Sequence, residues 1–141
     1  MYASQGNRAT AYAKVGMETG VMAADAHKLT LMLYEGALLA IARARLHLQQ
    51  KQIAEKGRAV SHAINIIGNG LKASLDVKAG GDLAEKLAAL YDYMCQQLFL
   101  ANINNDDAAL AEVARLLADI KSAWEEIAGN PAVHSANQAA A

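Results

Sequence analysis

The sequence predicts an all-α domain that folds as an antiparallel, up-down-up-down four-helix bundle. Of the 141 residues, 54% are hydrophobic, but a large part of these are alanine and only 5% of the chain is aromatic, a composition that favours helix. The chain has a single proline, Pro131. Apolar residues recur with helical spacing in four segments, and the connections between them are short. Short connections make neighbouring helices antiparallel.

The two ends of the chain differ from this pattern. Residues 1–24 are small and polar with a few scattered apolar residues, and we expect them to form a mobile N-terminal arm or a short helix that docks on the body. Residues 25–129 form the bundle. Residues 130–141 have little to bury and are predicted to be a disordered tail.

The first helix is predicted over residues 26–50, with Asp25 as its N-cap. Its central stretch, residues 29–42, reads LTLMLYEGALLAIA and carries one charge, on Glu35. Apolar side chains therefore lie on nearly every side of this helix, and such a helix must be covered on more than one side. The stretch is too short for a membrane span of about 20 apolar residues. We therefore expect the first helix to be well buried in the bundle.

The second helix is predicted over residues 53–75 and the third over residues 82–103, with a turn at residues 76–81 between them. Asp82 and Glu85 have the spacing of a capping box at the start of the third helix. Each helix has one apolar seam: Ile53, Val60, Ile64, Ile67, Leu71 and Leu75 in the second, and Leu83, Leu87, Leu90, Met94 and Leu98 in the third.

The fourth helix is predicted over residues 107–128. The cluster Asn104-Asn105-Asp106-Asp107 is typical of a turn followed by a helix cap. Gly129 and Pro131 end the helix. Its apolar residues alternate at steps of three and four, which is the seam of a heptad repeat: Leu110, Val113, Leu117, Ile120, Trp124 and Ile127.

No pattern in the sequence indicates catalysis, a metal or a cofactor. None of the histidines, at positions 27, 47, 62 and 134, has a glutamate three residues before it, as the metal sites of helical bundles require. Cys95 lies beside an apolar seam, where a thiol acts as a small hydrophobic group. We therefore expect that the protein is not an enzyme.

Charge and cysteine content restrict the possible partners and location. The net charge is −1, and lysine and arginine are spread along the chain without the basic stripe that nucleic-acid binding requires. We find no signal peptide and only one cysteine, which favours a cytoplasmic location.

The sequence has more apolar residues than four narrow seams need. These residues widen the core or, taken together, form grooves between helices that accept an apolar partner helix. They are Leu38, Leu39, Ile41, Ile66, Tyr91, Tyr93, Phe99 and Leu100.

The same segments resemble the flagellar secretion chaperone FliS family. Residues 27–37, HKLTLMLYEGA, are similar to the opening helix of that family, with Asp25 and Ala26 in place of the usual serine cap and proline. The resemblance extends over about residues 10–128 and includes Tyr12, Val15, Ser74-Leu75-Asp76, Gly80-Gly81, the run from Leu90 to Met94, Ala101-Asn102 and Trp124.

This resemblance implies a chaperone that holds the disordered C-terminal segment of new flagellin, prevents its premature polymerisation and delivers it to the type III export gate. It also implies that the N-terminal arm covers part of the binding surface until the client displaces it. We predict client contacts at Ile66, Leu71, Leu75, Tyr91, Met94 and Leu98, a polar contact at Asn102, and competition from Tyr12 and Val15 of the arm.

Two other interpretations remain open. The first is a self-associating structural bundle that has no flagellin client and whose spare apolar surface forms a homodimer. The second is an enzyme or metal protein built on a bundle. Light scattering with and without a flagellin tail separates the first from a chaperone, and metal analysis tests the second.

Overall fold

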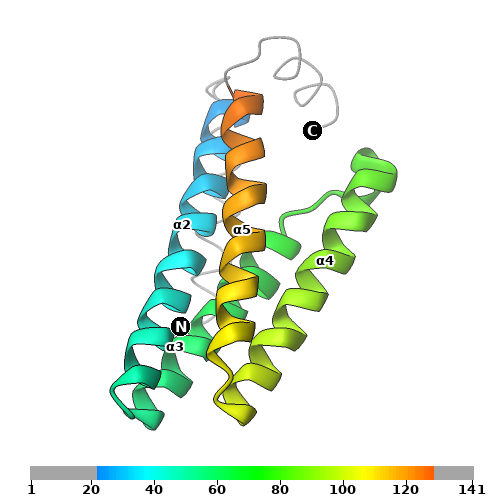
Figure 1. Ribbon diagram of the computed structural model, residues 1–141. Helices are drawn as coiled ribbons and strands as arrows, with labels where there is room; N and C mark the ends of the chain where they lie inside the picture. Colours follow the sequence, from blue (N-terminus) through cyan, green and yellow to red (C-terminus); the bar gives the residue numbers. More distant parts are fainter. Residues whose placement is uncertain (1–21, 129–141) are drawn as a thin grey trace, which may run out of the picture.

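The computed structural model describes residues 22–128 as a four-helix bundle (Figure 1). The elements are α2 (Met22–Gln49), α3 (Ile53–Asn65), the π-helix η1 (Ile66–Lys72) that continues α3, α4 (Val77–Asn104) and α5 (Asp107–Ala128). Consecutive helices run in opposite directions (Figure 1). Both α2 and α4 pack against α3, η1 and α5, so α2 and α4 occupy diagonal corners. The predicted fold class is confirmed; the predicted tail and all but the last three residues of the predicted arm lie outside the described residues.

A single core cluster joins the helices. Its alanines allow the helices to approach closely, while its leucines, isoleucines and aromatic residues supply most of the buried apolar area, about 1.5–3 kcal/mol for each fully buried large side chain. Trp124 adds a contact between α5 and α2, because its Nε1 donates to the carbonyl of His27 at 3.3 Å. The cluster contains Tyr34, Ala37, Ala40, Ile41, Ala44, Val60, Ala63, Ile67, Leu71, Tyr91, Met94, Leu98, Ala101, Leu110, Val113 and Leu117.

Helix α2 differs from its prediction at its start and on its outer side. The described helix already includes Met22, so Asp25 lies within its first turn, and the prediction that Asp25 is the N-cap is wrong. An acid in the first turn still interacts favourably with the helix dipole. Tyr34 and Ile41 are buried as expected, but Met32 and Leu39 are 57% and 52% exposed. The helix is covered by α3, η1 and α5, as expected for a helix that must be covered on more than one side, and its outer face remains exposed.

The second predicted helix is divided into α3 and η1. The π-helical segment contains Gly68 and Gly70, which weaken the α-helix at this point. A Cβ atom at Gly70 would lie 3.1 Å from Leu33 Cδ2, so glycine allows η1 to approach α2 closely here. An apolar seam indicates which side chains face the core, but it does not indicate which backbone hydrogen bonds form. The sequence therefore predicted a continuous α-helix.

Helix α4 consists of a short first segment and a long helix, which are separated by a bend at Gly81, so the long helix begins at Asp82 as predicted. Asp76 caps the short segment and accepts from the amide of Ala79 at 3.0 Å, so the predicted turn at residues 76–81 contains a capped helical turn. Gly81 has φ 55° and ψ −136°, a conformation that glycine adopts far more easily than other residues. Beyond this bend Leu83 is 67% exposed while Ala84 is buried, so the seam prediction is wrong at Leu83. Figure 1 shows α4 diverging from α5 toward the N-terminal end of α4.

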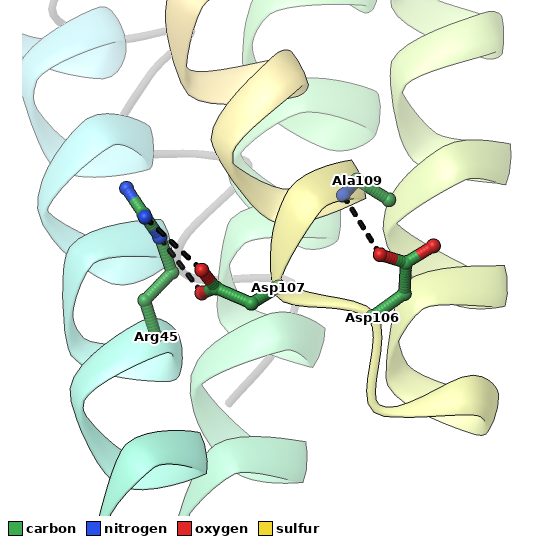
Figure 2. Close-up of polar contacts among 4 residues, drawn as sticks. All are labelled: Arg45, Asp106, Asp107 and Ala109. Atoms are coloured by element: carbon green, nitrogen blue, oxygen red, sulfur yellow. Dashed lines mark hydrogen bonds and ion pairs between the residues drawn. The ribbon is translucent and has the colours of Figure 1, made fainter.

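The turn between α4 and α5 matches its prediction. Asn105 ends α4 in the left-handed conformation, with φ 52°. Asp106 then accepts from the amide of Ala109 at 3.2 Å, and Asp107 binds Arg45 of α2 through two hydrogen bonds of 2.9 and 3.1 Å (Figure 2). These contacts fix where α5 begins and how it lies against α2, and the predicted bounds of α5 are confirmed.

We expect Asp107→Asn to lower the free energy of unfolding at neutral pH by about 0.5–1 kcal/mol, because both partners of the ion pair are partly exposed and screened by water. The hydrogen bond from Arg45 holds the pKa of the Asp107 carboxyl below its usual value. A carboxyl group whose pKa is lower in the folded than in the unfolded protein stabilises the fold at pH values above its unfolded-state pKa. This stabilisation is lost as the pH falls through its folded-state pKa. Urea unfolding should therefore show that the difference between wild type and variant decreases as the pH falls below the usual aspartate pKa of about 3.9. A difference that does not decrease as the pH is lowered further would contradict this account.

Candidate functional site

Eleven large apolar side chains are exposed on the described part of the chain, and they lie mainly on two helices. Exposed apolar side chains that gather on a surface mark a site of protein interaction more often than isolated ones. We define the α2 face as Met32, Leu39 and Leu46, and the α4 face as Tyr93, Phe99, Leu100 and Ile103. The other exposed members are Leu29, Ile53, Val77 and Leu83.

The predicted contact residues divide into three groups. Four of them are core residues that are at most 2% exposed: Leu71, Tyr91, Met94 and Leu98. Ile66, Leu75 and Asn102 are half-buried, and Tyr12 and Val15 lie outside the described residues. A partner that lies on the closed bundle reaches the half-buried group and the exposed faces, whereas it reaches the core group only if the helices separate.

The half-buried residues do not form one surface. Ile66 of η1 faces α2, where its Cδ1 lies 3.5 Å from the position that a Cβ atom would take at Gly36. Leu75 precedes α4 and packs against the edge of the core. The Oδ1 of Asn102 lies 3.8 Å from the position of a Cβ atom at Gly57, so Asn102 faces α3.

Asn102 shares one side of α4 with Cys95 and Phe99, because these three residues are spaced at four and three positions. Cys95 marks the direction of this side, since its Sγ donates to the carbonyl of Ile64 at 3.7 Å. Burial raises the pKa of this thiol, which keeps it protonated at neutral pH. Phe99 and, one turn on, Ile103 are 57% and 61% exposed beside Asn102. This edge of the α4 face combines apolar side chains with one polar amide.

Tyr91 connects the diagonal helices within the core. Its hydroxyl lies 2.5 Å from the hydroxyl of Tyr34, and both side chains are buried. Burial raises the pKa of both phenols. The contact satisfies two polar groups that would otherwise be desolvated, and it holds α4 at a fixed distance from α2.

We expect Tyr91→Phe to cost about 1 kcal/mol of unfolding free energy at neutral pH, since the Tyr34 hydroxyl loses its partner. A raised folded-state pKa gives stability that is present below the unfolded pKa of about 10 and is lost as the pH rises through the folded one. Wild type should therefore lose more stability than the double variant Tyr34→Phe/Tyr91→Phe when urea unfolding is repeated near pH 11. Equal losses in wild type and double variant would contradict the assignment.

Several exposed residues were foreseen and others were not. Leu39, Tyr93, Phe99 and Leu100 belong to the spare apolar set and are exposed, whereas Ile41 and Tyr91 of that set are core residues. Three residues that the sequence analysis did not single out complete the two faces: Met32, Leu46 and Ile103. The seven-residue spacing of Met32, Leu39 and Leu46 was a signal for the α2 face, because it repeats on the side opposite the buried seam.

The described residues contain no group of three or more His, Cys, Asp or Glu side chains that is placed to hold a metal ion. Within residues 22–128, no helix has the length and apolarity that crossing a bilayer requires. The surface features that the structure does offer are the apolar α2 and α4 faces.

Comparison with known proteins agrees with the resemblance. The family model of the flagellar protein FliS matches residues 8–131. The flagellar secretion chaperone FliS of Salmonella typhimurium is 50% identical over 127 residues, covering 90% of this chain and 93% of that protein. The proteins of the same name from Escherichia coli and Bacillus subtilis are 43% and 33% identical, over 94% and 85% of this chain and 96% and 85% of theirs. The chain therefore belongs to the flagellar protein FliS family.

Proposed function

We propose that this chain is a cytoplasmic export chaperone that binds the disordered C-terminal segment of flagellin, prevents its premature polymerisation and aids its secretion through the flagellar type III apparatus. The relatives named as flagellar secretion chaperones support this role, since each of the three compared covers most of its own length and most of this chain. The structural observation that carries the proposal is the exposed α4 face, which gives an apolar client segment a place to bind.

In this proposal the client forms helical pieces as its apolar residues pack on Phe99 and Ile103, with the amide of Asn102 as a polar contact. Burial of apolar surface stabilises the complex by about 25 cal/mol per Å² and offsets the cost of ordering the client. Ile66 and Leu75 are proposed as further contacts on other sides of the bundle. Tyr12 and Val15 are proposed to compete with the client, and a component of the export gate is proposed as a second partner.

The four core residues of the predicted site have a different part in this proposal. Leu71, Tyr91, Met94 and Leu98 hold the helices that display the half-buried and exposed contacts. They contact the client directly only if it enters between separated helices.

Calorimetry with a synthetic peptide of the flagellin C-terminal segment tests the α4 face. Phe99→Asp and Ile103→Asp should each weaken binding about tenfold or more, because each removes an apolar contact worth about 1.5–3 kcal/mol when buried. Leu39→Asp is the matched control, since Leu39 is similarly exposed but lies on α2. Ile66→Asp tests the separate contact on η1.

Circular dichroism shows that each variant is folded. Unchanged affinity of folded Phe99→Asp and Ile103→Asp would remove the α4 face from the site. Co-purification with flagellin that lacks its C-terminal segment tests the client itself: retained binding would show that the client segment is wrongly identified.

A further inference from the structure

The α2 face is arranged symmetrically about Leu39. Met32 and Leu46 each lie seven residues from Leu39, which is two helical turns, so the three side chains form one line on the side away from the core. They are 57%, 52% and 50% exposed in order along the chain. The buried Tyr34 and Ile41 lie on the opposite side of the same turns.

Two charges repeat this symmetry with opposite signs. Glu35 lies four residues before Leu39, and Arg43 lies four residues after it. Both are exposed, and neither forms an ion pair with another residue in the described range 22–128. In both directions from Leu39, the helix therefore has a charged side chain at the fourth residue and an apolar side chain at the seventh. The charge is negative toward the N-terminus, at Glu35, and positive toward the C-terminus, at Arg43.

We propose that the α2 face is the interface of a homodimer in which two copies of α2 pack antiparallel about a two-fold axis at Leu39. Leu39 then meets Leu39 of the other copy, and Met32 of each copy meets Leu46 of the other. Glu35 of each copy meets Arg43 of the other. Because of the two-fold axis, each of these contacts occurs twice, and only the contact between the two Leu39 side chains occurs once. A second copy of the same chain thus supplies both the apolar and the charged complement of this face.

The charges also select the orientation. In a parallel pair in register, Glu35 would meet Glu35 and Arg43 would meet Arg43, and like charges at an interface disfavour that arrangement. The contact between the outer residues extends over about 21 Å of helix. One helix pair buries less area than the roughly 1,200–2,000 Å² of a stable interface, so the dimer is reversible and depends on concentration. The α2 and α4 faces lie on diagonal helices, so the dimer and the proposed client contact at Phe99 use separate surfaces.

Sedimentation of the full chain over a wide concentration range tests the dimer by charge reversal. Wild type should change from monomer to dimer as concentration rises. Glu35→Arg and Arg43→Glu should each weaken the dimer about tenfold or more, because each places like charges opposite each other at two points. The double variant Glu35→Arg/Arg43→Glu should restore the dimer, since it exchanges the two signs. Arg115→Glu, an exposed reversal on α5, is the control and should behave like wild type.

Rescue by the double variant shows that the single reversals weaken the dimer through the charge contact and not by damaging the fold, because a second reversal would not repair a damaged fold. A wild type that remains monomeric at every concentration would overturn the proposal, as would a dimer that persists in Leu39→Asp and in both single reversals. If removing residues 1–21 makes a monomeric chain dimerise, the N-terminal segment occupies this face, and the proposal is also overturned. If the flagellin peptide binds a monomeric wild type but not Leu39→Asp, the face belongs to the client instead of a second copy. The proposed client contact at the α4 face is tested separately, by the effect of Phe99→Asp and Ile103→Asp on peptide binding.

Discussion

Replacing Leu98 with alanine is expected to lower the free energy of unfolding by about 2–5 kcal/mol, whereas the same change at the next residue, Phe99, should alter it by about 0.5 kcal/mol or less. Leu98 is 0% exposed within the core cluster, so its truncation removes buried apolar contacts and leaves a cavity. Phe99 is 57% exposed, so the removal of its ring breaks few contacts within the bundle.

The same pair of variants distinguishes the core from the proposed client surface. Urea unfolding followed by circular dichroism gives the stability of each variant, and calorimetry with the flagellin peptide gives its affinity. We expect Leu98→Ala to lose stability and to keep its peptide affinity under conditions where it is folded, while Phe99→Ala keeps its stability and binds more weakly. The reverse pattern would place Leu98 in the client site and would show that the bundle opens to receive the client.

The sequence was sufficient for the parts of the fold that depend on local contacts. The bounds of α5 were predicted because a turn cluster begins it, a heptad seam follows its whole length, and Gly129 and Pro131 follow its end. Asp106 and Asn105 act within a few residues of their own positions, as capping and left-handed residues do. Short connections were enough to make the helices antiparallel.

The sequence was not sufficient where an apolar side chain had a choice between core and surface. In α2 and α4 apolar residues lie on several sides, so periodicity alone does not decide that Met94 is buried and Phe99 exposed. That choice depends on which helices are neighbours and on how α4 lies beyond Gly81. For this reason the predicted site included four core residues and omitted Ile103, which is exposed.

The burial of one polar residue, Lys56, was not predicted, because lysine side chains usually lie at the surface. The predicted seam of the second helix has a step of seven from Ile53 to Val60, where a helix should present one more core residue. Lys56 occupies that place and is 2% exposed. Its Nζ donates to the carbonyl of Asn102 at 2.8 Å and to Oδ1 of Asn105 at 2.5 Å. The last carbonyls of a helix have no amide partner within it, so Lys56 completes the C-terminal end of α4.

Lys56→Ala should therefore lower the free energy of unfolding by about 2–4 kcal/mol, because it removes charge-assisted hydrogen bonds and the packing of a long buried stem. Lys56→Met keeps most of that packing and should cost less, so the difference between the two variants separates the stem from the ammonium group. Lys72→Ala is the matched control: its ion pair with Asp92, at 2.7 Å, is partly exposed and is worth about 1 kcal/mol or less. Urea unfolding of the three variants measures these differences. If Lys56→Ala costs no more than Lys72→Ala, the buried lysine does not hold α3 to the end of α4, and the position of Asn102 depends on apolar packing alone.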